Sequence, residues 1–257
     1  MTIEDTEDLV DIDNEEAYEA DFAETEEEPL PLVAKRAEGE QISTNFVSSV
    51  PIITKKELIK SIKYPSSILF VAKKFAGKSN ALLNIINPKK FDNIFVVTVS
   101  GHTGNLNYLV KSKDNIFEEI NDEIIELILD FQVQHPKAKT AIILDDFINS
   151  ENTLRRVPLI MKLATSGRNF GVTLVICSQN LTSVPPALRK NAEYLFVGKN
   201  LWAAAKGLGD EYGTVDLPPK ELRTEISNIK DHSFLFYDER KGSWFKIPET
   251  EMKVYVK

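Results

Sequence analysis

The sequence is poor in residues that form covalent cross-links or bind metal ions. Its single cysteine, Cys177, cannot build a disulfide framework, so we expect a reducing, intracellular setting. The three histidines, His102, His135 and His232, lack the spacing of metal ligands, which argues against a protein-bound zinc ion.

Long apolar runs are also lacking. No stretch approaches the roughly eighteen residues that a membrane span needs, and the acidic N-terminus is the opposite of a signal peptide. We therefore expect a soluble protein that has no membrane partner.

Charge is distributed very unevenly along the chain. Residues 1–40 contain sixteen acidic side chains against Lys35 and Arg36, a net charge of −14, whereas the whole chain carries −8, so residues 41–257 carry +6. Few aromatic residues and no periodicity predict a disordered acidic tail over residues 1–40. Residues 41–63 are expected to form a linker with a short strand or helix. Such a tail could keep the protein soluble, mimic nucleic acid and screen a basic face, or dock onto a basic partner.

A phosphate-binding loop is predicted between the apolar run Ile68–Val71 and a following helical pattern. Its residues are Ala72, Lys73, Lys74, Phe75, Ala76, Gly77, Lys78, Ser79 and Asn80. Backbone N–H groups at a helix N-terminus can surround the phosphates of ATP, while Lys78 reaches the β and γ phosphates and Ser79 holds Mg²⁺. Ala72 replaces the first glycine of the consensus and restricts positive φ there. The alternative is an ordinary strand–turn–helix with a basic turn.

An acidic pair follows a second buried-strand pattern, residues 140–144. Carboxylates at the C-terminal end of a parallel strand lie beside the phosphate loop in α/β sheets. Asp145 is then the outer-sphere Mg²⁺ partner, and Asp146 can polarise the attacking water. Alternatively, the pair could cap the N-terminus of the next helix.

The segment 159–191 contains a helix, a Gly-Arg turn at Arg168, a buried strand that ends at Gln179, and an Arg-x-Asn element at Arg189. This order resembles the FtsK and HerA superfamily of ring-forming DNA-pumping ATPases, and within it the genome-packaging ATPases of large DNA viruses and virophages. The resemblance covers about residues 64–200.

The three polar residues of this segment have candidate catalytic roles. Gln179 can hydrogen-bond the water and the γ-phosphate, and Arg168 can enter a neighbouring subunit as an arginine finger, which is worth about 10³ to 10⁵ in rate. Arg189 is the second finger candidate. Alternatively, Gln179 caps a strand, and the arginines are solvated helix-end cations.

Strands that alternate with helices predict an α/β fold, namely a P-loop NTPase of the RecA and FtsK kind with a mostly parallel sheet flanked by helices. Strands are expected at residues 67–71, 93–99, 140–144, 172–178 and 193–198, and helices at 78–87, 121–134, 153–166, 201–208 and 218–229. Residues 64–200 form the ATPase core, and residues 201–257 complete the domain with helices and a β-hairpin at 234–247. The glycine-rich segment 206–213 reads as a flexible lid or subunit contact. Tyr237, Trp244 and Phe245 read as packing residues rather than base-stacking groups.

The resemblance implies an ATP-driven translocase of double-stranded DNA that fills a viral capsid. It implies a homo-oligomeric ring, a hexamer or a pentamer, which contacts DNA without base readout and which could bind a capsid protein, in the virion or in a viral factory of the host cytoplasm. Arg155 and Arg156 are candidates for the pore, although a solvated helix face explains them equally well. The alternatives are a conjugation-type or cellular DNA pump, a nucleotide-binding interaction module with little turnover, and a nucleoside kinase.

Overall fold

The computed structural model describes residues 49–98, 105–119, 122–145, 158–200 and 202–252. The tail predicted over residues 1–40 lies outside these ranges. None of the described helices is long and apolar enough to cross a membrane. The helices are α1 (Lys55–Ser61), α2 (Lys78–Ile85), α3 (Asp122–Gln134), α5 (Pro158–Ser166), α6 (Pro186–Lys190), α7 (Trp202–Tyr212) and α8 (Pro219–Ser227). Short 3-10 turns are η1 (Pro88–Lys90), η3 (Asn105–Tyr108), η4 (Lys113–Asn115), η5 (Gly167–Phe170) and η6 (Glu249–Glu251).

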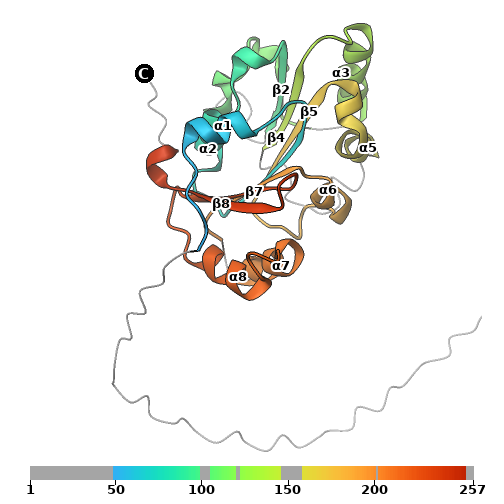
Figure 1. Cartoon of the computed structure of the whole chain (residues 1–257). Helices are drawn as coiled ribbons and strands as arrows, with labels where there is room; N and C mark the ends of the chain where they lie inside the picture. Colours follow the sequence, from blue (N-terminus) through green and yellow to red (C-terminus); the bar gives the residue numbers. More distant parts are fainter. Residues whose placement is uncertain (1–48, 99–104, 120–121, 146–157, 201, 253–257) are drawn as a thin grey trace, which may run out of the picture. The chain divides into compact units, whose positions relative to one another are not determined.

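A mostly parallel sheet forms the centre of the molecule (Figure 1). Its strands are β1 (Ser67–Val71), β2 (Asn93–Thr98), β3 (Ile116–Phe117), β4 (Thr140–Asp145), β5 (Val172–Ser178), β6 (Tyr194–Val197), β7 (Phe234–Asp238) and β8 (Ser243–Ile247). In the described chain, the eight strands have the order β3-β2-β4-β5-β1-β6-β7-β8. The strands from β3 to β6 in this order pair in parallel, and β7 and β8 extend the sheet as an antiparallel pair. The predicted α/β fold with a C-terminal hairpin is confirmed.

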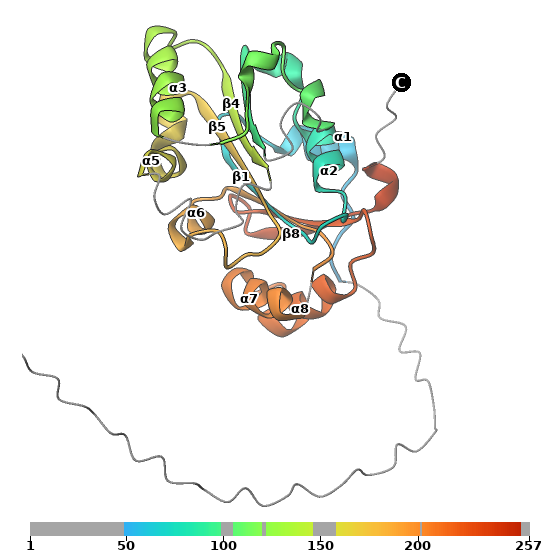
Figure 2. The same cartoon turned by 180° about the vertical axis from the view of Figure 1, so that it is seen from behind.

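Helices cover both faces of the sheet. Figures 1 and 2 show α3 and α5 on the face opposite to α1 and α2. The alternation within the strands matches this arrangement: Leu69 of β1 packs in the cluster of α3 and α5, whereas its neighbours Ile68 and Phe70 pack in the cluster of α1 and α2. Strands buried on both faces read as continuous apolar runs, which is why they were predictable from sequence.

Aromatic rings join the parallel core to the antiparallel hairpin. Phe70 of β1 stacks on Phe196 of β6 with centroids 4.4 Å apart, and Phe196 lies 4.8 Å from Phe236 of β7. Phe236 in turn lies 6.1 Å from Phe245 of β8. Such pairs stabilise adjacent strands beyond their area burial, by about 0.5–1.5 kcal/mol each.

The hairpin aromatics pack inside the molecule, as predicted. Trp244 is 4% exposed, Tyr237 is 8% exposed, and Phe245 packs against the cluster of α1 and α2. The indole N–H of Trp244 donates to the carbonyl of Tyr212 at 3.1 Å, which ties β8 to the end of α7.

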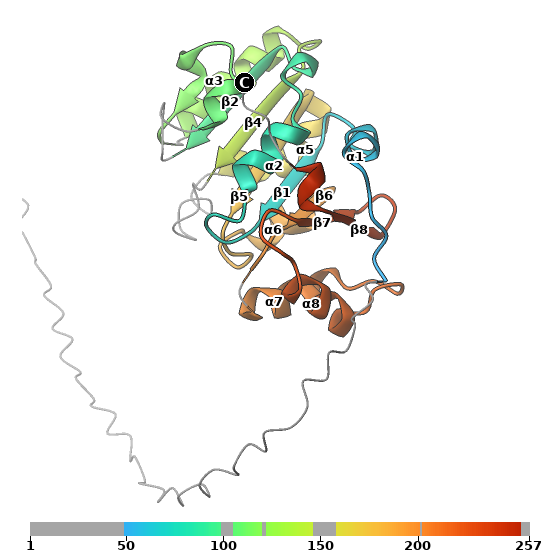
Figure 3. The ribbon, with the colours of Figure 1, turned by 90° about the vertical axis from the view of Figure 1, so that its left-hand side faces the viewer.

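The structure corrects the prediction that the glycine-rich segment 206–213 is flexible. It is not a flexible loop, because α7 continues through it to Tyr212. A Cβ at Gly209 would lie 2.4 Å from the Arg223 side chain and 2.8 Å from the Pro219 carbonyl. The glycine therefore permits close contact between α7 and α8, which lie side by side in Figure 3.

Part of the segment read as a linker is built into the sheet and its cover. Thr54 and Glu57 form a capping box at the start of α1, and Leu58 is buried in the cluster that α2 shares. Ile53 N–H donates to the Lys246 carbonyl at 3.0 Å, so the segment before α1 also covers the edge strand β8. Covering an edge strand in this way protects it from pairing with other chains.

Candidate functional site

The predicted phosphate loop connects β1 to α2 as the sequence indicates. β1 ends at Val71 and α2 begins at Lys78. Gly77 is the N-cap of α2, with φ 91° and ψ 19°, in the left-handed region that favours glycine. The backbone therefore turns sharply before a helix N-terminus, which is the geometry that binds phosphate groups.

Lys78 is held against the loop that precedes it. The residue is 6% exposed, and its Nζ donates to the carbonyl of Ala72 at 2.9 Å and to that of Lys73 at 3.4 Å. The loop is closed by a hydrogen bond of 3.3 Å from Ala76 N–H to the Lys73 carbonyl. The ammonium group is thus placed on the concave side of the loop.

Ala72, which departs from the glycine consensus, fits its position. The described non-glycine residues with positive φ are Phe75 and His232, so Ala72 does not need the conformational freedom of glycine. Its methyl group is fully buried against Gly198, where an added Cβ would lie 2.7 Å from the Ala72 Cβ. A glycine after β6 therefore provides the space that the loop alanine occupies.

A cavity of about 490 Å³ opens beside the loop, within the usual range of ligand pockets. Its lining residues are Lys74, Phe75, Gly77, Lys78, Ser79, Asn80, Asn105 and His232. Phe75 is 84% exposed, and the Lys74 Nζ lies 5.2 Å from the centre of its ring. The cavity thus combines several N–H groups and cations with one exposed aromatic ring.

The acidic strand β4 ends beside the phosphate loop, at the carboxyl ends of the parallel strands. Asp145 is the last residue of β4 and is 7% exposed, and its register partner on β5 is Cys177. β5 lies between β4 and β1, and its Ser178 pairs with Val71, the last residue before the loop. Gln179, directly after Ser178, therefore leaves the sheet between the phosphate loop and the acid.

Three predicted functional residues lie outside the described residues: Asp146, Arg155 and Arg156. Asp145 is the part of the acidic pair that the structure describes. The proposed roles of the other three stay predictions.

Arg168 lies at the opposite end of the parallel strands, near the amino end of β5. It belongs to η5, directly before β5, while Gln179 directly follows β5. At about 3.3 Å per residue, the seven residues of β5 separate the two by roughly 20 Å. The side chain of Arg168 is 61% exposed, and its Nε lies 3.0 Å from an oxygen of Glu193, which also pairs with Arg240.

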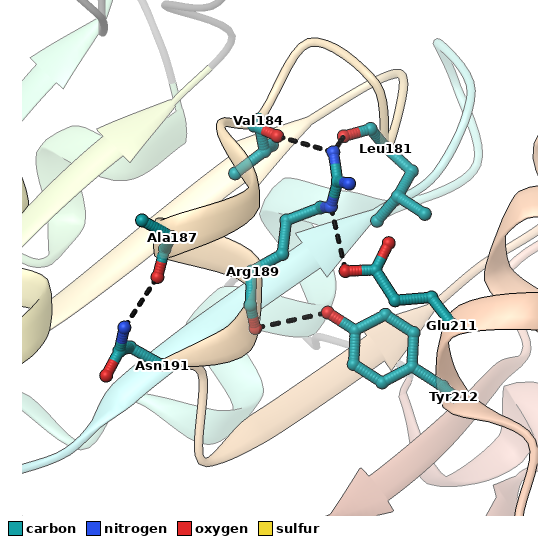
Figure 4. Close-up of polar contacts among 7 residues, drawn as sticks. All are labelled: Leu181, Val184, Ala187, Arg189, Asn191, Glu211 and Tyr212. Carbon is teal, nitrogen blue, oxygen red and sulfur yellow. Dashed lines mark hydrogen bonds and ion pairs between the residues drawn. The ribbon is translucent and has the colours of Figure 1, made fainter.

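Arg189 is engaged within its own subunit, as Figure 4 shows. One Nη donates to the Val184 carbonyl at 2.7 Å and the Leu181 carbonyl at 3.2 Å, and Nε lies 3.0 Å from a carboxylate oxygen of Glu211. The side chain is only 15% exposed. The Tyr212 hydroxyl donates to the Arg189 carbonyl at 3.1 Å, and burial raises the pKa of this tyrosine above its usual value. These contacts connect the loop after β5 to α7.

Sequence reasoning missed the turn that precedes β7. His232 lines the cavity, and Asp231 accepts a hydrogen bond of 2.8 Å from Lys199 and lies 3.9 Å from the Lys73 Nζ. The hydrogen bond from Lys199, together with the nearby charges of Lys199 and Lys73, lowers the pKa of Asp231. No local motif marks these residues, because only the antiparallel pairing of β7 with β6 brings their turn to the loop.

The sheet order, the lysine-bearing loop between β1 and α2, and the acid at the end of β4 together define a P-loop NTPase fold. No family model and no curated protein matches the chain. Solved structures do. The genome packaging NTPase B204 from Sulfolobus turreted icosahedral virus 2, in complex with AMP, aligns with a TM-score of 0.55 and 15% identity over 72% of this chain and 98% of that one.

Two further structures show the range of the similarity. The DNA-packaging ATPase B204 from Sulfolobus turreted icosahedral virus aligns with a TM-score of 0.53 and 16% identity over 70% of this chain and 96% of that one. The cytoplasmic domain of the Type VII secretion ATPase EccC from Thermomonospora curvata aligns with a TM-score of 0.47 and 14% identity, over 70% of this chain and 23% of that one. At such identities the likeness to B204 establishes the fold.

Proposed function

We propose that the protein binds ATP at the phosphate loop, hydrolyses it, and uses the hydrolysis to move double-stranded DNA into a viral capsid. One observation carries the ATPase part. The carboxyl ends of neighbouring parallel strands bring together buried Lys78 on the loop, Asp145 at the end of β4 and Gln179 after β5.

Phosphate binding follows from the loop and the start of α2. The N–H groups at the helix N-terminus attract anions, and the helix dipole adds to this attraction. Lys78 would exchange its bonds to the carbonyls of Ala72 and Lys73 for bonds to the β and γ phosphates. Because the lysine is already placed on the concave side of the loop, little rearrangement is needed.

Ser79 and Asp145 are the residues that would hold Mg²⁺. The Ser79 hydroxyl would supply an oxygen ligand, Asp145 would act as the outer-sphere partner through water, and the phosphates would supply further oxygens. When bound, the ion neutralises charge on the β and γ phosphates.

Water activation is assigned to the residues that flank the metal partner. Asp146, directly after Asp145 in the chain, would polarise the attacking water. Gln179 would hydrogen-bond the water and the γ-phosphate from the neighbouring strand. Its place between the loop and the acid supports this role.

The position of Arg168 supports a ring. A residue roughly 20 Å from its own phosphate loop, at the opposite end of β5, can reach a nucleotide only in a neighbouring subunit. A head-to-tail ring brings one edge of a subunit to the opposite edge of the next. Arg168 is therefore the preferred finger over Arg189, whose guanidinium is held by Leu181, Val184 and Glu211.

DNA as the substrate and a capsid as the destination are supported more indirectly. Residues 41–257 carry a net charge of +6, which suits a polyanionic track that is gripped through its phosphates. The B204 structures that share the fold are described as a genome packaging NTPase and a DNA-packaging ATPase. A hexameric or pentameric ring, a capsid protein as a partner, and a place in the virion or a viral factory complete the proposal.

ATP hydrolysis measured with and without duplex DNA tests this function. We expect Mg²⁺-dependent hydrolysis that duplex DNA stimulates, and loss of both activities in Lys78→Ala. Hydrolysis without stimulation would contradict the translocase and favour a nucleotide-binding interaction module. Packaging of DNA into capsids, compared with transfer between cells, separates the packaging motor from a conjugation-type or cellular pump.

A further inference from the structure

The turn between α8 and β7 stores backbone strain beside the phosphate loop. Ser233 N–H donates to the Lys230 carbonyl at 3.2 Å and closes the turn, and His232 within it has a φ of 62°. A positive φ is unfavourable for a non-glycine residue, and such residues cluster at functional sites.

The imidazole of His232 lies directly against the loop. Its Nδ1 is 2.8 Å from the place that a Cβ on Gly77 would occupy, so only glycine at that position allows the contact. His232 and Lys78 line the same cavity. Two positions with positive φ, one on each segment, thus bring the ring to the residue that precedes the phosphate-binding lysine.

The turn is also anchored by charge. Asp231, the neighbour of His232, bonds Lys199 after β6 and lies near Lys73 of the loop. These contacts connect the turn to the segment after β6 and to the start of the phosphate loop, without using Lys78 or Ser79. The closed turn and these ion pairs together hold His232 next to the loop.

We propose that His232 is a further contact for the phosphate groups of the bound nucleotide, donating a hydrogen bond from its ring. The inference rests on the proposed nucleotide site. A ring N–H is a hydrogen-bond donor in either neutral tautomer and in the charged form. The ring stands beside Gly77, whose N–H belongs to the same anion-binding loop, so a phosphate is the group it would meet.

A simpler role must be separated from this one, since histidine tolerates the left-handed region better than most residues and could merely complete the turn. His232→Gly distinguishes the two, because glycine adopts the turn without strain but has no donor. Lys230→Gly is the matched control: it adds a glycine to the same turn at an exposed position that does not line the cavity.

Binding of ATP, ADP and inorganic tripolyphosphate to the full chain is measured by calorimetry, with thermal unfolding of each variant without ligand. We expect His232→Gly to bind all three about ten- to a hundred-fold more weakly, with no loss of melting temperature, and Lys230→Gly to bind normally. Unchanged affinity in His232→Gly, or a loss for the nucleotides but not for tripolyphosphate, would overturn the proposal.

Lys78→Ala separates failure of this inference from failure of the proposed function. If Lys78→Ala binds ATP as tightly as the unmodified protein, the nucleotide site itself is misplaced. If Lys78→Ala loses binding while His232→Gly retains it, the site stands and only the role of His232 is wrong.

Discussion

At the scale of single residues, compensation explains a departure from the phosphate-loop consensus. Ala72 occupies the place of a glycine, and Gly198 on the neighbouring strand end leaves room for its methyl group. Position 72 does not need the backbone freedom of glycine, since the loop glycine that carries a positive φ, Gly77, is present. Sequence alone marks the substitution but cannot reveal the partner, which lies 126 positions away in the chain.

Lys78→Ala is expected to weaken ATP binding by roughly a hundred-fold or more. Removing a charge-assisted contact to the phosphates costs about 3 kcal/mol, and 1.4 kcal/mol corresponds to a factor of ten. Lys74→Ala is the matched control, because Lys74 lies on the same loop but is exposed and stacks near Phe75. It is expected to lose less than ten-fold. Isothermal titration with ATP makes the comparison, and equal losses in the two variants would remove the special role of Lys78.

At the scale of elements, the two candidate arginines have different surroundings. Arg189 ties the loop after β5 to α7, whereas Arg168 is exposed at the amino end of β5. Stability and turnover should therefore respond differently to their removal.

Arg189→Ala is expected to destabilise the fold by about 2 kcal/mol, because it leaves the carbonyls of Leu181 and Val184 and the carboxylate of Glu211 without their donor. For a domain of this size, that corresponds to a fall in melting temperature of about 4–8 °C. Lys190→Ala, at the neighbouring exposed position on α6, is the control and should change it little. A normal melting temperature for Arg189→Ala together with lost hydrolysis would instead make Arg189 the finger.

The sequence predicts an element well when a single cause, such as burial on both faces of the sheet, produces its residue pattern. The strand at residues 172–178 is found with its exact predicted bounds, since seven residues buried on both faces leave an uninterrupted apolar run. The helix over 202–212 was predicted too short because Gly207 and Gly209 are typical of a loop, whereas Gly209 allows the close contact between α7 and α8. Local propensity cannot distinguish a flexible glycine from one that a neighbouring helix requires.

At the scale of the whole molecule, one part of the candidate site is predictable from local sequence patterns, and the other part depends on tertiary contacts. The phosphate loop and the acidic strand are predictable, because each is a short local motif and the parallel sheet brings their ends together. The turn with Asp231 and His232 is not, because it reaches the loop only through the antiparallel return of β7. A tertiary contact of this kind leaves no spacing rule in the sequence.

Deleting residues 1–40 is expected to leave the melting temperature and basal hydrolysis unchanged, because the composition of this segment cannot bury a core. DNA affinity is the informative measurement. It should rise, and its salt dependence should steepen, if the net charge of −14 screens the basic remainder of the chain. A large loss of thermal stability on truncation would refute the prediction.

Arg168→Ala is expected to lose most hydrolysis while it still binds ATP at its own phosphate loop. The Arg168 side chain is 61% exposed, and the buried Glu193 keeps its pair with Arg240, so stability should change by less than about 1 kcal/mol. Arg168→Lys should not restore activity, because a flexible point charge cannot replace the planar, forked guanidinium.

Mixing Arg168→Ala with Lys78→Ala tests whether the arginine acts between subunits. In a mixed ring, some interfaces pair an intact phosphate loop on one subunit with an intact arginine on the next, so part of the hydrolysis should return. Each protein alone has no such interface and should stay inactive. Rings shown to contain both variants but without recovered activity would exclude a finger in trans. Since Arg168 is roughly 20 Å from its own site, they would leave it as a surface cation that pairs with Glu193.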